Sequence, residues 1–172
     1  MLKFPTLGAA FAVAALFASP AHAQFKIRAG AETQIVQHVN NPPAGASSTT
    51  WLTDQWRPSL VGMVGFSVIP SFLSLDAELA QTFIKDSQNL TTVRLGATLE
   101  PPVLPFYVRA AIPIQLTEPT FTSMRAAIGT LFGVPVAKIY LEFAADFPLS
   151  GSGHSFGDQQ TFSLGGGLQL NL

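Results

Sequence analysis

The sequence predicts an all-β fold, an eight-stranded antiparallel up-and-down transmembrane β-barrel. Apolar and polar residues alternate along eight segments of roughly ten to thirteen residues, which is the period of a β-strand. Twelve charged residues share one face of these segments with small polar residues, and the other face is almost wholly apolar. Charged residues make up only 11% of the chain, against about 25% in soluble domains. A chain this apolar, without a membrane-spanning helix, can satisfy its backbone in a bilayer by closing a sheet.

The first residues have the features of a secretory signal peptide. Lys3 supplies a positive charge, residues 7–18 form an apolar stretch that is short for a membrane span, and residues 21–23 form a small-x-small cleavage site. We expect residues 1–23 to be a cleaved signal peptide, with a retained anchor helix as the alternative, and residues 24–172 to form one exported domain. The chain has no cysteine, which excludes disulfides and a lipoprotein anchor.

Four strands are expected in the first half of the chain, separated by segments rich in turn-forming residues. In the third strand, Asp76 and Glu78 alternate with leucine and alanine, because successive side chains point to opposite sides of a sheet. These strands are expected at residues 25–37, 57–69, 72–84 and 90–100, and their connections at residues 38–56, 70–71 and 85–89.

Four more strands are expected in the second half. The proline-rich residues 101–105 cannot continue a ladder and end the fourth strand. Pro113 removes a ladder donor inside the fifth, so we expect a bulge or early fraying there. The glycines at residues 165–167 lack the lysine and the helix of a phosphate loop, and they indicate close strand packing or a kink. These strands are expected at residues 106–116, 122–132, 136–147 and 161–172, with a long polar connection at residues 148–160.

The alternation alone does not show which face is outside, because a soluble barrel with an apolar interior has the same pattern. Three features favour the membrane barrel. The polar face is rich in small residues, the strands are long enough to cross a bilayer at a tilt, and phenylalanines gather near the strand ends. These are Phe25, Phe106 and Phe132 at one rim, and Phe83, Phe121, Phe147 and Phe162 at the other.

An even number of strands places both termini on the periplasmic side and the longest connections on the outside. In this architecture the chain resembles the small eight-stranded outer-membrane barrels, the group that includes the OmpA transmembrane domain and the OmpX- and OmpW-like proteins. The resemblance implies a monomer in a Gram-negative outer membrane, in contact with lipid, lipopolysaccharide and the assembly machinery. Those proteins commonly end in an aromatic residue that the machinery reads, whereas this chain ends in Leu172. With 9 basic and 10 acidic residues, no nucleic acid partner is expected.

The twelve charged residues on the polar face are the candidate site, because that face lines the lumen. An eight-stranded barrel is barely wider than its own side chains, and an unpaired charge there would cost several kcal/mol. Six basic and six acidic residues therefore predict a paired network that plugs the lumen, with a gated pore or a proton path as the alternative. The network is expected to contain Lys26, Arg28, Glu32, Asp76, Glu78, Arg94, Glu100, Arg109, Arg125, Lys138, Glu142 and Asp146.

Two further features of the sequence are candidate sites. His154 and Ser155 are adjacent in a glycine-rich loop, and some small outer-membrane barrels are lipid A deacylases or acyltransferases that use serine and histidine, but a solvated histidine is the simpler interpretation. Trp51 and Trp56 flank the first loop, as interfacial anchors rather than a ligand platform. No metal or cofactor is expected.

The predicted function is a non-enzymatic barrel with a structural or surface-exposed role. A narrow channel for small or hydrophobic molecules and a lipid A-modifying enzyme are the alternatives.

Overall fold

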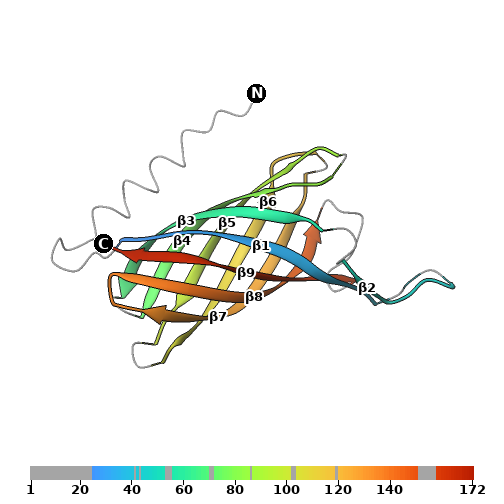
Figure 1. The fold of residues 1–172 in the computed structure, drawn as a ribbon. Helices are drawn as coiled ribbons and strands as arrows, with labels where there is room; N and C mark the ends of the chain where they lie inside the picture. Colours follow the sequence, from blue (N-terminus) through green and yellow to red (C-terminus); the bar gives the residue numbers. More distant parts are fainter. Residues whose placement is uncertain are drawn as a thin grey trace.

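Eight strands close into an antiparallel barrel (Figure 1), which confirms the predicted fold. Apart from the short β2, strands that follow each other along the chain pair with each other, and β1 pairs with β9 to close the sheet. The strands are β1 (Phe25–Val39), β2 (Thr49–Trp51), β3 (Pro58–Ile69), β4 (Leu73–Thr82), β5 (Leu90–Leu99), β6 (Phe106–Gln115), β7 (Thr122–Gly133), β8 (Ala137–Ser150) and β9 (Gln159–Asn171).

The computed structural model describes residues 25–40, 42, 44–52, 56–69, 72–85, 87–101, 104–118, 120–150 and 158–172. Within these ranges, no helix is long and apolar enough to cross a membrane. The predicted signal peptide, residues 1–23, lies outside the described residues, and its cleavage remains a prediction.

The strands turn their apolar face outward and their charged face into the barrel. Along β6, exposed and buried residues alternate without a break from Phe106 to Gln115. On β8 the outward Leu141 is 51% exposed, whereas Arg109 on the inner face of β6 is 3% exposed. The largest fully buried side chains include Tyr107 and Gln169, both on the polar face. A soluble barrel with an apolar interior is therefore excluded.

Phe25 and Leu172 meet at one end of the barrel, which we call the terminal end. The Phe25 N–H donates to the Leu172 carbonyl oxygen (3.1 Å), and the Leu172 N–H donates to that of Phe25 (2.8 Å). Phe106 and Phe132 are exposed together with Phe25, as expected for a rim at headgroup depth. We call the opposite end the loop end.

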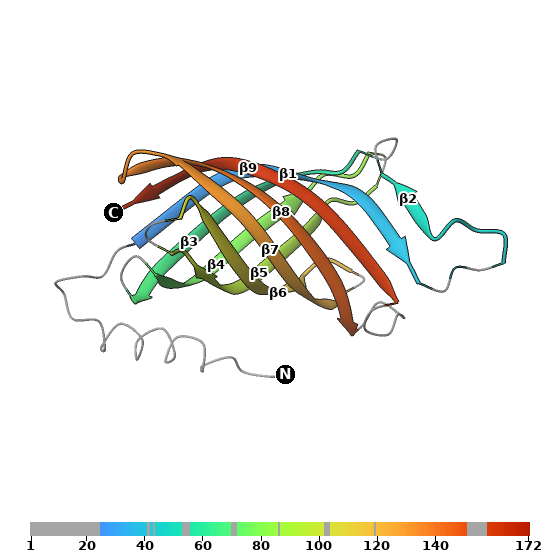
Figure 2. The ribbon, with the colours of Figure 1, turned by 90° about the horizontal axis from the view of Figure 1, so that it is seen from below.

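The first long connection is shorter than the sequence predicted. β1 runs to Val39, and β2 pairs with residues 36–38 of β1, so the two form a hairpin that projects beyond the loop end (Figures 1 and 2). The β1–β9 register shifts between Gln34 and Val36. Such a bulge inserts one residue into a strand, so the alternation breaks near residue 35. Because of this break, the sequence pattern did not reveal that β1 extends to Val39.

Two prolines lie inside strands where the sequence predicted an end or a distortion. β8 continues through Pro148 to Ser150, beside a register shift in its pairing with β7, and irregular ladders tolerate proline. Pro113 pairs with Arg94 on β5, and β6 continues to Gln115. The expected bulge at Pro113 was wrong, because the β6–β7 ladder skips this position and resumes in the same register.

Glycines allow strands and rings to approach closely inside the barrel. A Cβ on Gly167 would collide with the backbone of Ala29 and Gly30 on β1, so the glycine run of β9 serves close packing, as predicted. A Cβ on Gly129 would overlap the ring of Tyr107. Glycine at this position therefore leaves room for a large side chain in the lumen.

Candidate functional site in the lumen

Arginines and carboxylates meet directly in the middle of the lumen. Arg94 Nη1 donates to Glu78 Oε1 (2.5 Å), and its guanidinium also pairs with Glu32. Arg109 Nη1 donates to Glu78 Oε2 (2.9 Å), and its Nε donates to Asp76 Oδ1 (2.9 Å). Glu78 therefore bridges two arginines that come from the neighbouring strands β5 and β6.

Arg125 on β7 extends these contacts across the lumen. Its Nη2 lies 2.7 Å from Glu32 Oε2 and 3.5 Å from Glu142 Oε1, and its Nη1 lies 2.8 Å from Asp146 Oδ2. Charge-assisted bonds of this kind are about twice as strong as neutral ones. We call the set that ion pairs of 3.5 Å or less join here the middle network: Glu32, Asp76, Glu78, Arg94, Arg109, Arg125, Glu142 and Asp146.

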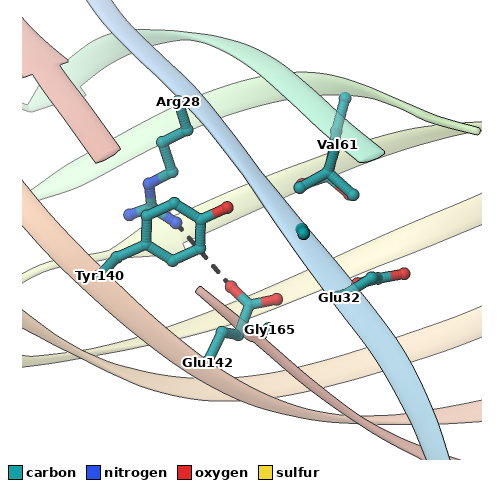
Figure 3. Close-up of a pocket in the computed structure, with 8 residues that line it drawn as sticks. Arg28, Glu32, Val61, Tyr140, Glu142 and Gly165 are labelled. Carbon is teal, nitrogen blue, oxygen red and sulfur yellow. Dashed lines mark ion pairs between the residues drawn. The ribbon is translucent and has the colours of Figure 1, made fainter. Parts of the chain in front are cut away.

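Two tyrosines and Arg28 pack against the middle network. The Tyr107 hydroxyl donates to Glu142 Oε2 (2.9 Å). The Arg28 guanidinium lies 4.3 Å from the centroid of the Tyr107 ring and 5.2 Å from that of Tyr140, within the range of cation–π attraction. Arg28 Nε also donates to Gln169 Oε1 (2.5 Å). Figure 3 shows the Tyr140 ring beside Arg28, with the Arg28–Glu142 pair (3.8 Å) drawn as a dashed line.

These side chains leave little open space between them. The cavity in Figure 3, which Arg28, Glu32, Tyr140 and Glu142 help to line, has a volume of about 10 Å³. A volume of this size holds about one water molecule.

The terminal end of the lumen has the opposite charge excess. Lys26 Nζ lies 2.9 Å from Glu100 Oε2, and Arg28 Nη2 lies 3.1 Å from Glu100 Oε1. The half-buried Lys138 makes no ion pair with any described residue. Three basic side chains therefore lie near one acidic side chain, Glu100, which pairs with only two of them. The middle network, by contrast, has five carboxylates for three arginines. Lys26 and Lys138 line a cavity of about 350 Å³, which we call the terminal cavity.

The structure joins eleven of the twelve predicted charges in ion pairs and leaves Lys138 out. The predicted site residues did not include Tyr107, Tyr140 and Gln169. All three alternate with the apolar residues of their strands and so lie on the polar face. This alternation was sufficient to assign them to the lumen. Trp51, outside the lumen, is exposed on the projecting hairpin.

The fold and the site define a class: a small eight-stranded antiparallel barrel with an exposed apolar exterior and an interior filled by ion pairs. Among solved structures, the chain is similar to the crystal structure of Neisserial surface protein A, with a TM-score of 0.53 and 9% sequence identity, over 86% of this chain and 97% of that chain. At this identity the likeness shows the fold alone. It confirms the resemblance to small eight-stranded outer-membrane barrels. No protein-family model matches the chain, and no curated protein matches it.

Proposed function

We propose that the protein is a non-enzymatic β-barrel of the bacterial outer membrane, with a structural or surface-exposed role and a lumen closed by its own charges. One observation carries the proposal: the exposed outer face is apolar, and ion pairs fill the interior. Burial of apolar surface is favourable by about 25 cal/mol per Å², so lipid is the medium that suits this exterior. The similarity in fold to Neisserial surface protein A supports the barrel architecture on which the proposal depends.

The membrane placement is tested with two leucines on the outer face of β8. Leu141 lies near the middle of the strand and Leu149 near its loop end, and both are exposed. An arginine at the bilayer midplane costs about 2–4 kcal/mol, and one near the interface about 0–1 kcal/mol. In urea titrations of protein refolded into lipid vesicles, Leu141→Arg is expected to show the larger loss, and Leu149→Arg is the matched control. Equal losses would contradict a bilayer around the barrel.

The closed lumen is tested by the passage of small solutes. Vesicles that contain the refolded protein are placed in isoosmotic solutions of sugars of increasing size. The proposal expects them to swell no faster than protein-free vesicles, because ion pairs fill the middle of the lumen and the cavity beside Arg28 and Glu142 holds about one water molecule. Swelling that slows as the sugar becomes larger would establish the narrow-channel alternative instead.

The proposal also includes export by the signal peptide and a monomer that contacts lipid and lipopolysaccharide. Membrane fractionation of cells that express the full chain is expected to place the protein in the outer membrane. The enzyme alternative depends on His154 and Ser155, which lie outside the described residues. Mass spectra of lipid A from cells with and without the gene are expected to be the same. Loss or gain of an acyl chain would replace the proposal with the enzyme.

A further inference from the structure

The terminal cavity combines a charged wall with an apolar one. Its volume of about 350 Å³ falls in the range of small-molecule sites, which is about 300–1,000 Å³. Lys26, Lys138 and the acidic Glu100 line one part, and Leu104, Leu131 and Val136 line another. Sites for small molecules combine apolar walls with a few polar groups that orient the ligand, and this cavity has both kinds of wall.

The charged wall of this cavity has an unmatched positive charge. Glu100 is already shared by Lys26 (2.9 Å) and Arg28 (3.1 Å), so it is not free to neutralise a third cation. Lys138 is half-buried and has no ion-pair partner among the described residues. An ammonium group in a partly buried wall is stabilised by an anion that enters the cavity.

A neighbouring amide is held in place beside this charge. Asn171 Nδ2 donates to the Pro135 carbonyl oxygen (2.6 Å), and Asn171 Oδ1 accepts from Gln169 Nε2 (2.8 Å). Asn171 and Lys138 lie on the neighbouring strands β9 and β8, and Asn171 pairs with Lys26 on β1. The two lysines therefore flank a fixed strand, which presets the geometry of the charged wall.

We propose that the terminal cavity binds a small organic anion, a carboxylate or phosphate group attached to an apolar body. The anionic group would lie at Lys138 and Lys26, and the apolar body would lie against Leu104, Leu131 and Val136. This inference goes beyond the proposed function and does not depend on it, because a closed middle network and an occupied terminal cavity are separate properties of the lumen.

The test is a titration of the refolded, ¹⁵N-labelled protein in a zwitterionic detergent, followed through backbone amide signals. Benzoate and phenyl phosphate are the two anions, and benzyl alcohol is the neutral analogue of similar shape. Saturable shifts at Leu131, Lys138 and Asn171 are expected with at least one anion, and the anion that saturates first identifies the headgroup class. No saturation is expected with the alcohol. Absence of saturation with both anions, or equal saturation with the alcohol, would overturn the proposal.

Two variants tie the binding to Lys138. Lys138→Met removes the charge and keeps the length of the side chain, so the apparent Kd for the anion is expected to rise at least tenfold. Lys85→Met is the matched control, because Lys85 is exposed in the connection at the opposite end, and no change is expected. An unchanged Kd in Lys138→Met would contradict the site.

A third variant separates a loss of binding from a loss of folding. Val136 is exposed in the β7–β8 turn and lines the cavity, so Val136→Trp adds bulk at the cavity wall without changing any charge. It is expected to abolish saturation by the anions while the amide spectrum of the rest of the barrel is retained. Full binding in this variant would place the anion outside the cavity and overturn the proposal.

Discussion

The middle network and the terminal cavity use the same kinds of residue but satisfy their charges differently. In the middle, three arginines meet five carboxylates, and the cavity left there is about 10 Å³. At the terminal end, Lys26 and Arg28 share Glu100, and Lys138 has no ion-pair partner among the described residues, beside a cavity of about 350 Å³. The difference shows that equal numbers of basic and acidic residues in a lumen can still be distributed unevenly, with carboxylates in excess in the middle and basic side chains in excess at one end. Where side chains fill the width, each charge needs a protein partner, and where space remains, water or a ligand can serve.

The comparison predicts its largest effect at Arg109, which is buried between Asp76 and Glu78. Arg109→Ala leaves both carboxylates without this partner, and removing one member of a buried pair costs about 3–5 kcal/mol. The measurement is the free energy of unfolding by urea in lipid vesicles. A loss below about 1 kcal/mol, typical of exposed pairs, would show that water fills the middle as well.

A smaller effect is expected where a ring fills the lumen. Gly129→Ala places a methyl group against the Tyr107 ring, and overpacking of this kind costs about 1–3 kcal/mol. Gly62 is the matched control, because a Cβ there meets nothing within 4 Å, so Gly62→Ala is expected to be neutral or slightly stabilising. The same urea titration measures both. Equal stability of the two variants would contradict the filled middle.

At the terminal end, we expect a still smaller loss in the free energy of unfolding. Lys26→Met removes one partner of Glu100 but leaves Arg28 at 3.1 Å. A hydrogen bond to a charged group contributes about 1.5–3 kcal/mol when no other partner replaces it, so we expect the lower end of that range or less. A loss as large as that of Arg109→Ala would remove the energetic difference between the two regions.

The smallest effect is expected at Lys138, which has no described ion pair to lose. In the absence of an anion, Lys138→Met should change the free energy of unfolding by no more than about 0.5 kcal/mol, as at an ordinary surface position. Addition of benzoate or phenyl phosphate should then stabilise the unmodified protein more than the variant. A large loss without any ligand would reveal a partner for Lys138 in the folded protein.

The sequence was sufficient for the fold, because side-chain direction in a strand repeats every two residues. Parity placed Asp76 and Glu78 on the polar face, and the small residues, the strand lengths and the phenylalanines near the strand ends assigned that face to the lumen. The ion pairs could not be assigned, because Glu32 is 62 residues from Arg94 and 93 residues from Arg125. Which charges meet depends on the stagger of eight strands around the barrel, and no local pattern encodes that stagger.

The misplaced boundaries have a related cause. The bulge between Gln34 and Val36 interrupts the alternation of β1. Proline is typical of loops, yet Pro148 pairs with Ser123 on β7. A pattern of period two finds regular strands and stops where a strand is irregular. At these irregular positions the strand continues because it pairs with the neighbouring strand, and that pairing is seen only in the closed barrel.

The central claim is that the middle network closes the lumen, and single-channel recording tests it most directly. Protein of residues 24–172, refolded from urea, is inserted into planar lipid bilayers, and the current is recorded at moderate voltage in high salt. The account predicts no steady ion conductance above that of the bare bilayer, because the cavity beside Arg28 and Glu142 holds about one water molecule. Steady nanosiemens openings of the unmodified protein would contradict it and establish the lumen as a channel.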